Sequence, residues 1–209
     1  MYRSVMVIDD FYDNPLEVRQ AALRLDYPVP AKPNNFPGRN SVQTVLMPNA
    51  DQLFSQIIGE PVVGAKNYAH GRCRIALAND VGAYYVHIDP GIMWSGVLCL
   101  TLPEHCRSGT AFFRHRKYGT DGAPIRPEEL AIYGAKSGAE VLDKTIEHGA
   151  SKDMSQWEVT MTVPLRFNRL ILFRSWMWHT AGESFGDSLA NGRLVQLFFF
   201  AGAAAQVSR

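Results

Sequence analysis

The sequence predicts a mainly β domain with flanking helices, built as a sandwich, barrel or jelly roll. From Arg72 onward the chain is a succession of short runs rich in β-branched and aromatic residues, and turn residues separate several of them. Most of these runs follow one another without a long helix between them. The 209 residues, of which 46% are apolar and 20% charged, suffice for one globular domain with its own hydrophobic core.

The N-terminal part, about residues 1–70, predicts one strand and two helices. The run "RSVMVIDDF" has strand character, and "DNPLEVRQAALRLD" begins like a helix, with Asn14 as cap, Pro15 in the first turn and Glu17 at capping-box spacing. A second helix is expected near "NADQLFSQIIGE", with Asn49 as its cap. Between the helices, "YPVPAKPNNFPGRNS" holds four of the twelve prolines and predicts an irregular loop.

The remaining chain predicts a β core over about residues 71–201. Seven runs have strand character: "CRIALA", "AYYVHID", "WSGVLCLTL", "GTAFFRH", "WEVTMTV", "RLILFRSW" and "RLVQLFFF". An insertion at about 117–156 interrupts them, with a polar, turn-rich start and then a helix through "EELAIYGAKSGAEVLDKTIEHG". We expect this insertion to cover one end of a single domain spanning residues 1–209.

Charge and cysteine content exclude several classes of partner. Lys and Arg number 21 and Asp and Glu number 20, so the net charge of +1 provides no basic field for nucleic acid. The three cysteines form no CxxC pair and are expected to be reduced thiols.

Asp9 and Asp10 precede any apolar core of signal-peptide length, and "LVQLFFFAGAAA" is too short to span a membrane. We therefore predict a cytoplasmic protein with no membrane partner.

The stretch "YYVHIDPG" places a histidine and an aspartate two residues apart in a predicted strand. Side chains at this spacing share a face, so His87 and Asp89 should converge as a catalytic dyad, a structural hydrogen bond or two-thirds of a metal site. His179, directly after the apolar strand of "LILFRSWMWH", could supply a third ligand. Two histidines and one carboxylate form the facial triad of non-haem Fe(II) oxygenases. Each histidine alone could equally be a buried residue bonded to backbone.

Arg193 lies 14 positions beyond His179 (193 − 179), at the start of an apolar strand. An arginine among hydrophobic residues needs an anionic partner, and its forked guanidinium suits a carboxylate. The partner could be a bound ligand. It could also be Asp187 or Glu183, in a structural salt bridge.

This combination of residues resembles the 2-oxoglutarate/Fe(II)-dependent dioxygenase superfamily, and is most similar to its prolyl-hydroxylase-like branch. The resemblance runs from about Arg72 to Phe200 and includes "WSGVLCLTLPEHCRSGTAFFRH" after the HxD and "FNRLILFRSWMWHTAG" before the distal histidine. An uncharacterised bacterial group of this superfamily shares the opening "DDFYDNP".

The resemblance implies a double-stranded β-helix (jelly roll, cupin-like) in which His87, Asp89 and His179 bind Fe(II). Arg193 would then bind the distal carboxylate of 2-oxoglutarate, with O₂ as the second cosubstrate. The implied reaction is hydroxylation of a C–H bond in a small-molecule or peptide-type substrate. The carboxylate of Asp89 argues against halogenation, because iron halogenases of the superfamily have a small residue at that position.

The resemblance departs from the family pattern at two positions. Val195 stands where the superfamily often has serine, and Leu77 stands where the prolyl-hydroxylase branch often has tyrosine. Other contacts to 2-oxoglutarate are therefore open, with Tyr84, Tyr85 and Arg74 as candidates.

Two other functions fit parts of the sequence. A non-catalytic cupin-like module could retain the metal ligands and bind a ligand without catalysing a reaction. The stretch "GESFG" matches the G-x-S-x-G elbow of serine hydrolases, with Ser184 as nucleophile, but that motif needs a strand before it and a helix after it.

Overall fold

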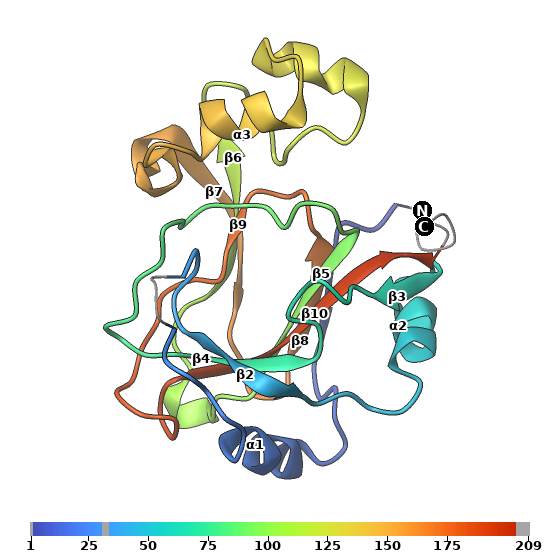
Figure 1. The fold of residues 1–209 in the computed structure, drawn as a ribbon, viewed down its shortest axis with the longest axis vertical. Coiled ribbons are helices and arrows are strands. Elements are labelled where there is room, and N and C mark those ends of the chain that lie inside the picture. The colour runs from blue at the N-terminus through green and yellow to red at the C-terminus, as the bar shows by residue number, and fades with distance from the viewer. Residues whose placement is uncertain (1, 31–33, 204–209) are drawn as a thin grey trace.

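The computed structural model describes residues 2–30 and 34–203, whose strands form a seven-stranded and a three-stranded sheet, both antiparallel (Figure 1). The large sheet has the order β1-β8-β5-β10-β4-β2, and β3 also pairs with β10. Its strands are β1 (Val5–Ile8), β2 (Arg39–Thr44), β3 (Val62–Gly64), β4 (Arg72–Ala76), β5 (Trp94–Cys99), β8 (Leu170–Arg174) and β10 (Arg193–Gly202).

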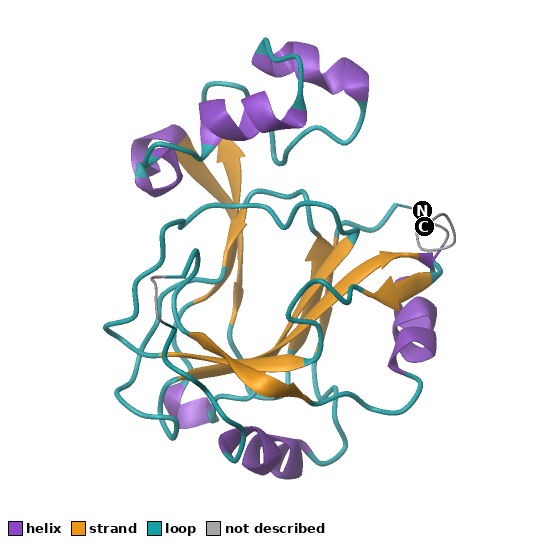
Figure 2. Ribbon diagram, viewed as in Figure 1, coloured by secondary structure: helices purple, strands orange, loops and turns teal. Residues whose placement is uncertain are grey.

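The small sheet has the order β7-β6-β9, and helices lie outside the two sheets (Figure 2). Its strands are β6 (Gly109–His115), β7 (Trp157–Pro164) and β9 (His179–Thr180). The α-helices are α1 (Pro15–Leu23), α2 (Ala50–Ile58) and α3 (Gly138–Thr145), and the 3₁₀ segments are η1 (Pro103–His105), η2 (Pro127–Tyr133), η3 (Ala150–Lys152) and η4 (Met154–Gln156). Among the described residues, none of the helices has both the length and the apolar character needed to cross a bilayer.

From β4 onward the chain passes between the sheets in the order of a double-stranded β-helix, with β6 and β7 consecutive in the small sheet. β4, β5, β8 and β10 are neighbours in the large sheet, while β6, β7 and β9 belong to the small one. Between β4 and β5, His87 bridges to His179 of β9 and so supplies the fourth position of the small sheet. The predicted fold class, mainly β with flanking helices and a double-stranded β-helix, is therefore confirmed.

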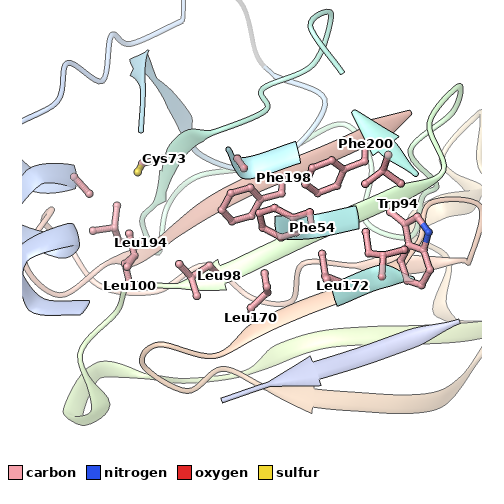
Figure 3. Packing of buried hydrophobic residues seen from close by; sticks show 14 of the residues in the cluster. Phe54, Cys73, Trp94, Leu98, Leu100, Leu170, Leu172, Leu194, Phe198 and Phe200 are labelled. Carbon is pink, nitrogen blue, oxygen red and sulfur yellow. The ribbon is translucent and has the colours of Figure 1, made fainter. Parts of the chain in front are cut away.

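The alternation of side chains along β10 divides the interior into two layers. Phe198 and Phe200 face the helical side and pack against Phe54 of α2, with ring centroids 4.8 and 4.6 Å apart (Figure 3). Val195 and Leu197, which have the opposite parity along the strand, point toward the small sheet. Arg193 shares their parity, so its side chain enters the space between the sheets.

Several elements differ from the sequence-based expectations. The run 83–89 is not a continuous strand, since only His87 is bridged, and β2, β3 and β9 were not expected. The helix expected through the insertion is split into η2 and α3, because Gly134 adopts φ 55°, a left-handed conformation that ends the first segment. Asn14 and Asn49 precede helices as predicted, but neither side chain makes a capping hydrogen bond. Residues 31–33 of the expected proline-rich loop lie outside the described residues.

The insertion begins and ends at one cross-strand pair. His115 of β6 is paired with Trp157 of β7, and the chain between them forms the helical segment above the small sheet in Figure 1. His115 is buried against the rings of Trp157 and Tyr118, at centroid distances of 4.7 and 4.8 Å. Neither of its ring nitrogens has a hydrogen-bond partner within the described residues. Burial, with a smaller effect from Lys117, lowers the pKa of His115.

We expect His115 to make the fold sensitive to acid. Its folded-state pKa lies below the unfolded value of 6.5, so the unfolded chain takes up a proton that the folded chain resists. The free energy of unfolding should fall as pH drops through about 6.5 and continue falling to the depressed folded-state pKa. In His115→Phe, which keeps the aromatic packing and cannot titrate, the loss between pH 7 and pH 5 should be smaller. Urea unfolding across this range measures the difference.

Equal acid sensitivity of wild type and His115→Phe would show that His115 titrates normally in the fold.

Candidate metal centre

His87, Asp89 and His179 converge on one point between the sheets. One potential ligand atom from each lies within 4.8 Å of the others. The two histidines exchange both backbone hydrogen bonds, each with an N···O distance of 2.9 Å, and so form a closely paired antiparallel bridge. The backbone N–H of Asp89 donates to the carbonyl of Ser175 at 2.9 Å. Backbone pairing therefore sets the position of all three side chains, although the first two lie in an irregular segment.

Each histidine is oriented by the carbonyl two residues before it. The Nδ1 of His87 lies 3.1 Å from the carbonyl oxygen of Tyr85, and the Nδ1 of His179 lies 2.8 Å from that of Met177. A carbonyl only accepts, so these contacts assign the ring proton to Nδ1 and leave Nε2 with a free lone pair. The Nε2 of His179 lies 3.5 Å from the Oδ2 of Asp89.

His87 and Asp89 are held in the protonation states that bind metals. Burial, together with the neighbouring His179, lowers the pKa of His87 to about 3, although Asp89 opposes this effect. Burial alone would raise the pKa of Asp89, but the adjacent imidazoles of His179 and His87 and the Ser95 hydroxyl lower it overall. The Ser95 Oγ donates to Asp89 Oδ2 at 2.5 Å.

The donor set suits a first-row divalent metal. Two imidazole nitrogens and one carboxylate oxygen match the ligand preferences of Fe(II), Mn(II) and Co(II), and no thiolate in the described residues joins the cluster. Aromatic rings hold the imidazoles in place, since Phe36 lies 4.2 Å from His87 and Phe173 lies 4.6 Å from His179, measured between centroids. The residues therefore fit a metal bound on one side by protein and open on the other.

A cavity of about 110 Å³ adjoins the three ligands. Its walls are largely apolar and aromatic, and include Val97, Phe173, Leu197 and Phe199. Arg193 also lines it and is only 3% exposed. The cavity thus combines potential metal ligands with a buried cation.

Arg193 has unused hydrogen-bonding capacity. Its Nε and Nη2 are buried without a partner among the described residues, and none of the ion pairs found there joins it to Asp187 or Glu183. Burial lowers its pKa to about 10, so the guanidinium remains charged at neutral pH. A buried, unpaired guanidinium is costly and is stabilised by an anion. The described structure therefore does not contain the alternative, a structural salt bridge from Arg193 to Asp187 or Glu183.

The three other candidates for cosubstrate contacts also line the cavity. Arg74 is already engaged, because its guanidinium donates to the carbonyls of Pro37 and Phe36 at 2.9 and 3.0 Å. Tyr84 donates its hydroxyl to the carboxylate of Glu147. Tyr85 has no side-chain hydrogen bond in the described structure, so its hydroxyl is the freest of these groups.

The insertion supports the segment that carries His87. The Val86 N–H donates to the Ser151 carbonyl at 3.1 Å, and the Tyr85 N–H donates to the Ser151 hydroxyl at 3.2 Å. Sequence reasoning missed both Ser151 and Ser95, because a single serine carries no motif. Only the burial of their hydroxyls next to functional groups reveals them.

The structure does not provide the context of a serine hydrolase around Ser184. Although Ser184 lines the cavity, the chain from 181 to 192 contains no helix, whereas the G-x-S-x-G elbow requires one directly after the serine.

The sequence profile of family DUF6445, described as a family of unknown function, matches residues 2–200. None of the curated protein sequences matches the chain. Solved structures with a similar shape include HygX from Streptomyces hygroscopicus with nickel and 2-oxoglutarate bound, at 13% identity and TM-score 0.49, covering 96% of this chain and 83% of HygX.

Two further solved structures resemble the chain to the same degree. One is a prolyl hydroxylase from Trichoplax adhaerens in complex with a peptide, at 14% identity and TM-score 0.48, covering 99% of this chain and 87% of the other. The second is the α-ketoglutarate-dependent carbocyclase SnoK from nogalamycin biosynthesis, at 13% identity and TM-score 0.49, covering 96% and 80%. Because all three TM-scores lie below 0.5, the fold assignment rests on the strand order of this chain.

We expect His179→Ala to weaken metal binding sharply. Loss of a residue that hydrogen-bonds to a metal ligand typically reduces metal affinity by roughly 10–100-fold. Removing one of the three ligands themselves should reduce the affinity for Mn(II) by more than this. Isothermal titration calorimetry with Mn(II) measures this affinity, and circular dichroism verifies the fold. The exposed His148 gives a matched control, since His148→Ala should bind as the wild type does. A His179→Ala protein with wild-type affinity would remove His179 from the site.

Proposed function

The chain belongs to family DUF6445, and we propose that it is an Fe(II)- and 2-oxoglutarate-dependent oxygenase that hydroxylates a C–H bond. The observation that supports this most strongly is the shared cavity, in which the cluster of His87, Asp89 and His179 faces the unpaired guanidinium of Arg193. A metal site alone would suit many proteins. A metal site beside a buried cation suits a bound dicarboxylate.

In this proposal the two imidazole Nε2 atoms and the Asp89 carboxylate hold Fe(II) through one side of its coordination sphere. Because His87 and Asp89 already have the required protonation states, metal binding displaces no proton from either at neutral pH. Ser95 keeps the Asp89 carboxylate in position. Fe(II) held by these three residues would have room to bind the cosubstrates.

Arg193 would bind the distal carboxylate of 2-oxoglutarate. A guanidinium can form two parallel hydrogen bonds to a carboxylate, and its two unpartnered nitrogens provide the donors. Tyr85 is the best placed of the remaining candidates to add a hydroxyl contact, because Arg74 and Tyr84 are already engaged. The 2-oxoglutarate carboxylates would offset the positive charge that the cavity now holds.

When bound, Fe(II), 2-oxoglutarate and O₂ supply the oxidising chemistry, which yields succinate and CO₂ and adds one oxygen atom to the substrate. The protein's own part is to orient the ligands and to exclude water. Val97, Phe173, Leu197 and Phe199 provide apolar walls for this purpose. Asp89 keeps a carboxylate at the metal, which favours hydroxylation over halogenation.

The decisive test is succinate formation by the protein loaded with Fe(II). The proposal predicts that succinate accumulates in a 2-oxoglutarate-dependent manner, and that intact-mass screening of small-molecule and peptide substrates finds one that gains a single oxygen. A protein that binds metal and 2-oxoglutarate but never releases succinate, with any substrate tested, is instead a cupin-like binding module. Labelling of Ser184 by a fluorophosphonate probe would favour the hydrolase.

We expect Arg193→Lys to weaken 2-oxoglutarate binding by about 1–3 kcal/mol, or roughly 5–150-fold. Lysine keeps the charge but cannot form the two parallel hydrogen bonds. The Kd for 2-oxoglutarate, measured on protein loaded with Mn(II), reports the change without turnover. Arg126→Lys on the exposed surface should bind normally and serves as the control. Unchanged affinity in Arg193→Lys would assign Arg193 to structure and move the carboxylate contact to another residue, with Arg74 the first to test.

A further inference from the structure

Two cysteines lie side by side at the C-terminal end of β5. Ser95 lies near the other end of this strand. Cys99 is the last residue of β5, and Cys106 follows η1 in the connection to β6. Their sulfur atoms are 3.7 Å apart. Both thiols also lie near the carbonyl oxygen of Thr101, with Cys106 Sγ at 3.3 Å and Cys99 Sγ at 3.8 Å. They therefore form a compact dithiol separate from the metal ligands.

The two thiols differ in exposure and in acidity. Cys99 is only 1% exposed, whereas Cys106 is half-buried and reachable from solvent. The hydrogen bond with Cys99 lowers the pKa of Cys106, and the nearby Arg19 acts in the same direction. The hydrogen bond with Cys106, together with burial, raises the pKa of Cys99. The accessible thiol is thus the more readily ionised one, as required for the sulfur that reacts first.

The third cysteine lacks these features. Cys73 is completely buried on β4, within the packed core that Figure 3 shows. Burial raises its pKa to about 11. It therefore provides an internal comparison for the other two.

We propose that Cys99 and Cys106 form an oxidation site, at which a peroxide closes a reversible disulfide bond between them. The Cys106 thiolate attacks one oxygen of hydrogen peroxide, so that an S–O bond forms, the O–O bond breaks and hydroxide leaves to become water. The Cys99 thiol loses its proton to the departing hydroxide and attacks the Cys106 sulfur. An S–S bond forms, the S–O bond of the Cys106 sulfenic acid breaks, and the leaving hydroxide takes up the Cys99 proton to give the second water. In sum, two thiols and one peroxide give one disulfide and two waters.

The geometry requires only a short movement. A disulfide has an S–S distance of about 2.05 Å, so the sulfurs must approach by about 1.7 Å from their present separation of 3.7 Å. Cys99 is fixed in the sheet by its pairing with Val195, whereas Cys106 lies in a connection outside the strands. The exposed side of the pair is therefore also the side that no strand pairing holds.

Thr101 connects the dithiol to the backbone around Arg193. Its carbonyl contacts both thiols, while its hydroxyl lies 3.2 Å from the Gly192 carbonyl and accepts from the Leu194 N–H at 2.9 Å. Closing the disulfide replaces the thiol contacts to Thr101 and so acts on the residues that flank Arg193. The oxidation site itself does not depend on the proposed oxygenase activity, because neither thiol is a metal ligand.

The test uses the full chain, with trace iron removed by a chelator so that hydrogen peroxide forms no radicals, and methionine oxidation is recognised separately by its gain of whole oxygen atoms. Before alkylation, we expect the intact mass to be lower by two hydrogen atoms than that of the reduced chain, and after alkylation the oxidised chain should carry two fewer alkyl groups. Cleavage after Glu104 separates the two cysteines in sequence, so their peptides should remain joined until a reductant is added. Two separate peptides, with Cys106 unreacted, over-oxidised or linked to another chain, would overturn the proposal.

Single variants test the order of the steps. In Cys99→Ser, Cys106 should stop at the sulfenic acid and be labelled by dimedone. In Cys106→Ser, loss of the Cys99 thiol should be slower by at least about tenfold, because the buried thiol is poorly ionised. Cys73→Ser should oxidise as the wild type does. Rapid oxidation of Cys99 in Cys106→Ser would refute the assigned order, and the wild-type peptide analysis stands whether or not each variant folds.

Discussion

The pair of backbone hydrogen bonds between His87 and His179 is the constraint on which the rest of the centre depends. Residues 83–89 form no continuous strand, so this bridge is what joins the first histidine to the small sheet. It brings the two imidazole centroids to 4.2 Å and leaves Asp89 beside Ser95 at the start of β5. Carbonyls two residues upstream then set the tautomer of each ring. Backbone geometry, which is stiff, thereby controls side chains that need sub-ångström placement.

Charge balance explains why such a centre should attract an anion. Burial keeps His87 neutral, so the fixed charges around the cavity are one carboxylate, Asp89, and two guanidiniums, Arg74 and Arg193. Arg74 is satisfied by two backbone carbonyls, whereas Arg193 is not. A divalent metal would increase the positive charge further. A dianionic ligand that contacts both the metal and Arg193 would lower the electrostatic cost of burying these positive charges, in keeping with the proposed use of 2-oxoglutarate.

The sequence predicted the fold class and most strands of the large sheet, because apolar runs such as those of β5, β8 and β10 are buried and leave a strong pattern. The sequence-based prediction failed for elements whose secondary structure depends on tertiary contacts. β9 is only two residues long, β2 reads "RNSVQT" within a predicted loop, and Gly134 ends a helix whose apolar pattern continues. His87, Asp89 and His179 were recognisable from spacing and strand context. Ser95 and Ser151 were not, because a hydroxyl that orients another residue has no fixed distance from it in sequence.

The attachment of the insertion at His115 and Trp157 has a consequence for how this protein can diverge. Since the segment leaves and re-enters the small sheet at one cross-strand pair, its length can change without shifting the register of β6 and β7. Its contacts, however, are unequal. Ser151 supports the backbone just before His87, and Glu147 holds Tyr84 at the cavity, whereas Tyr133 of η2 directs its hydroxyl to Thr120 and Gly122. Relatives that act on different molecules should therefore vary in the η2 half and retain the 147–151 half, so that new specificities can arise without disturbing the ligands.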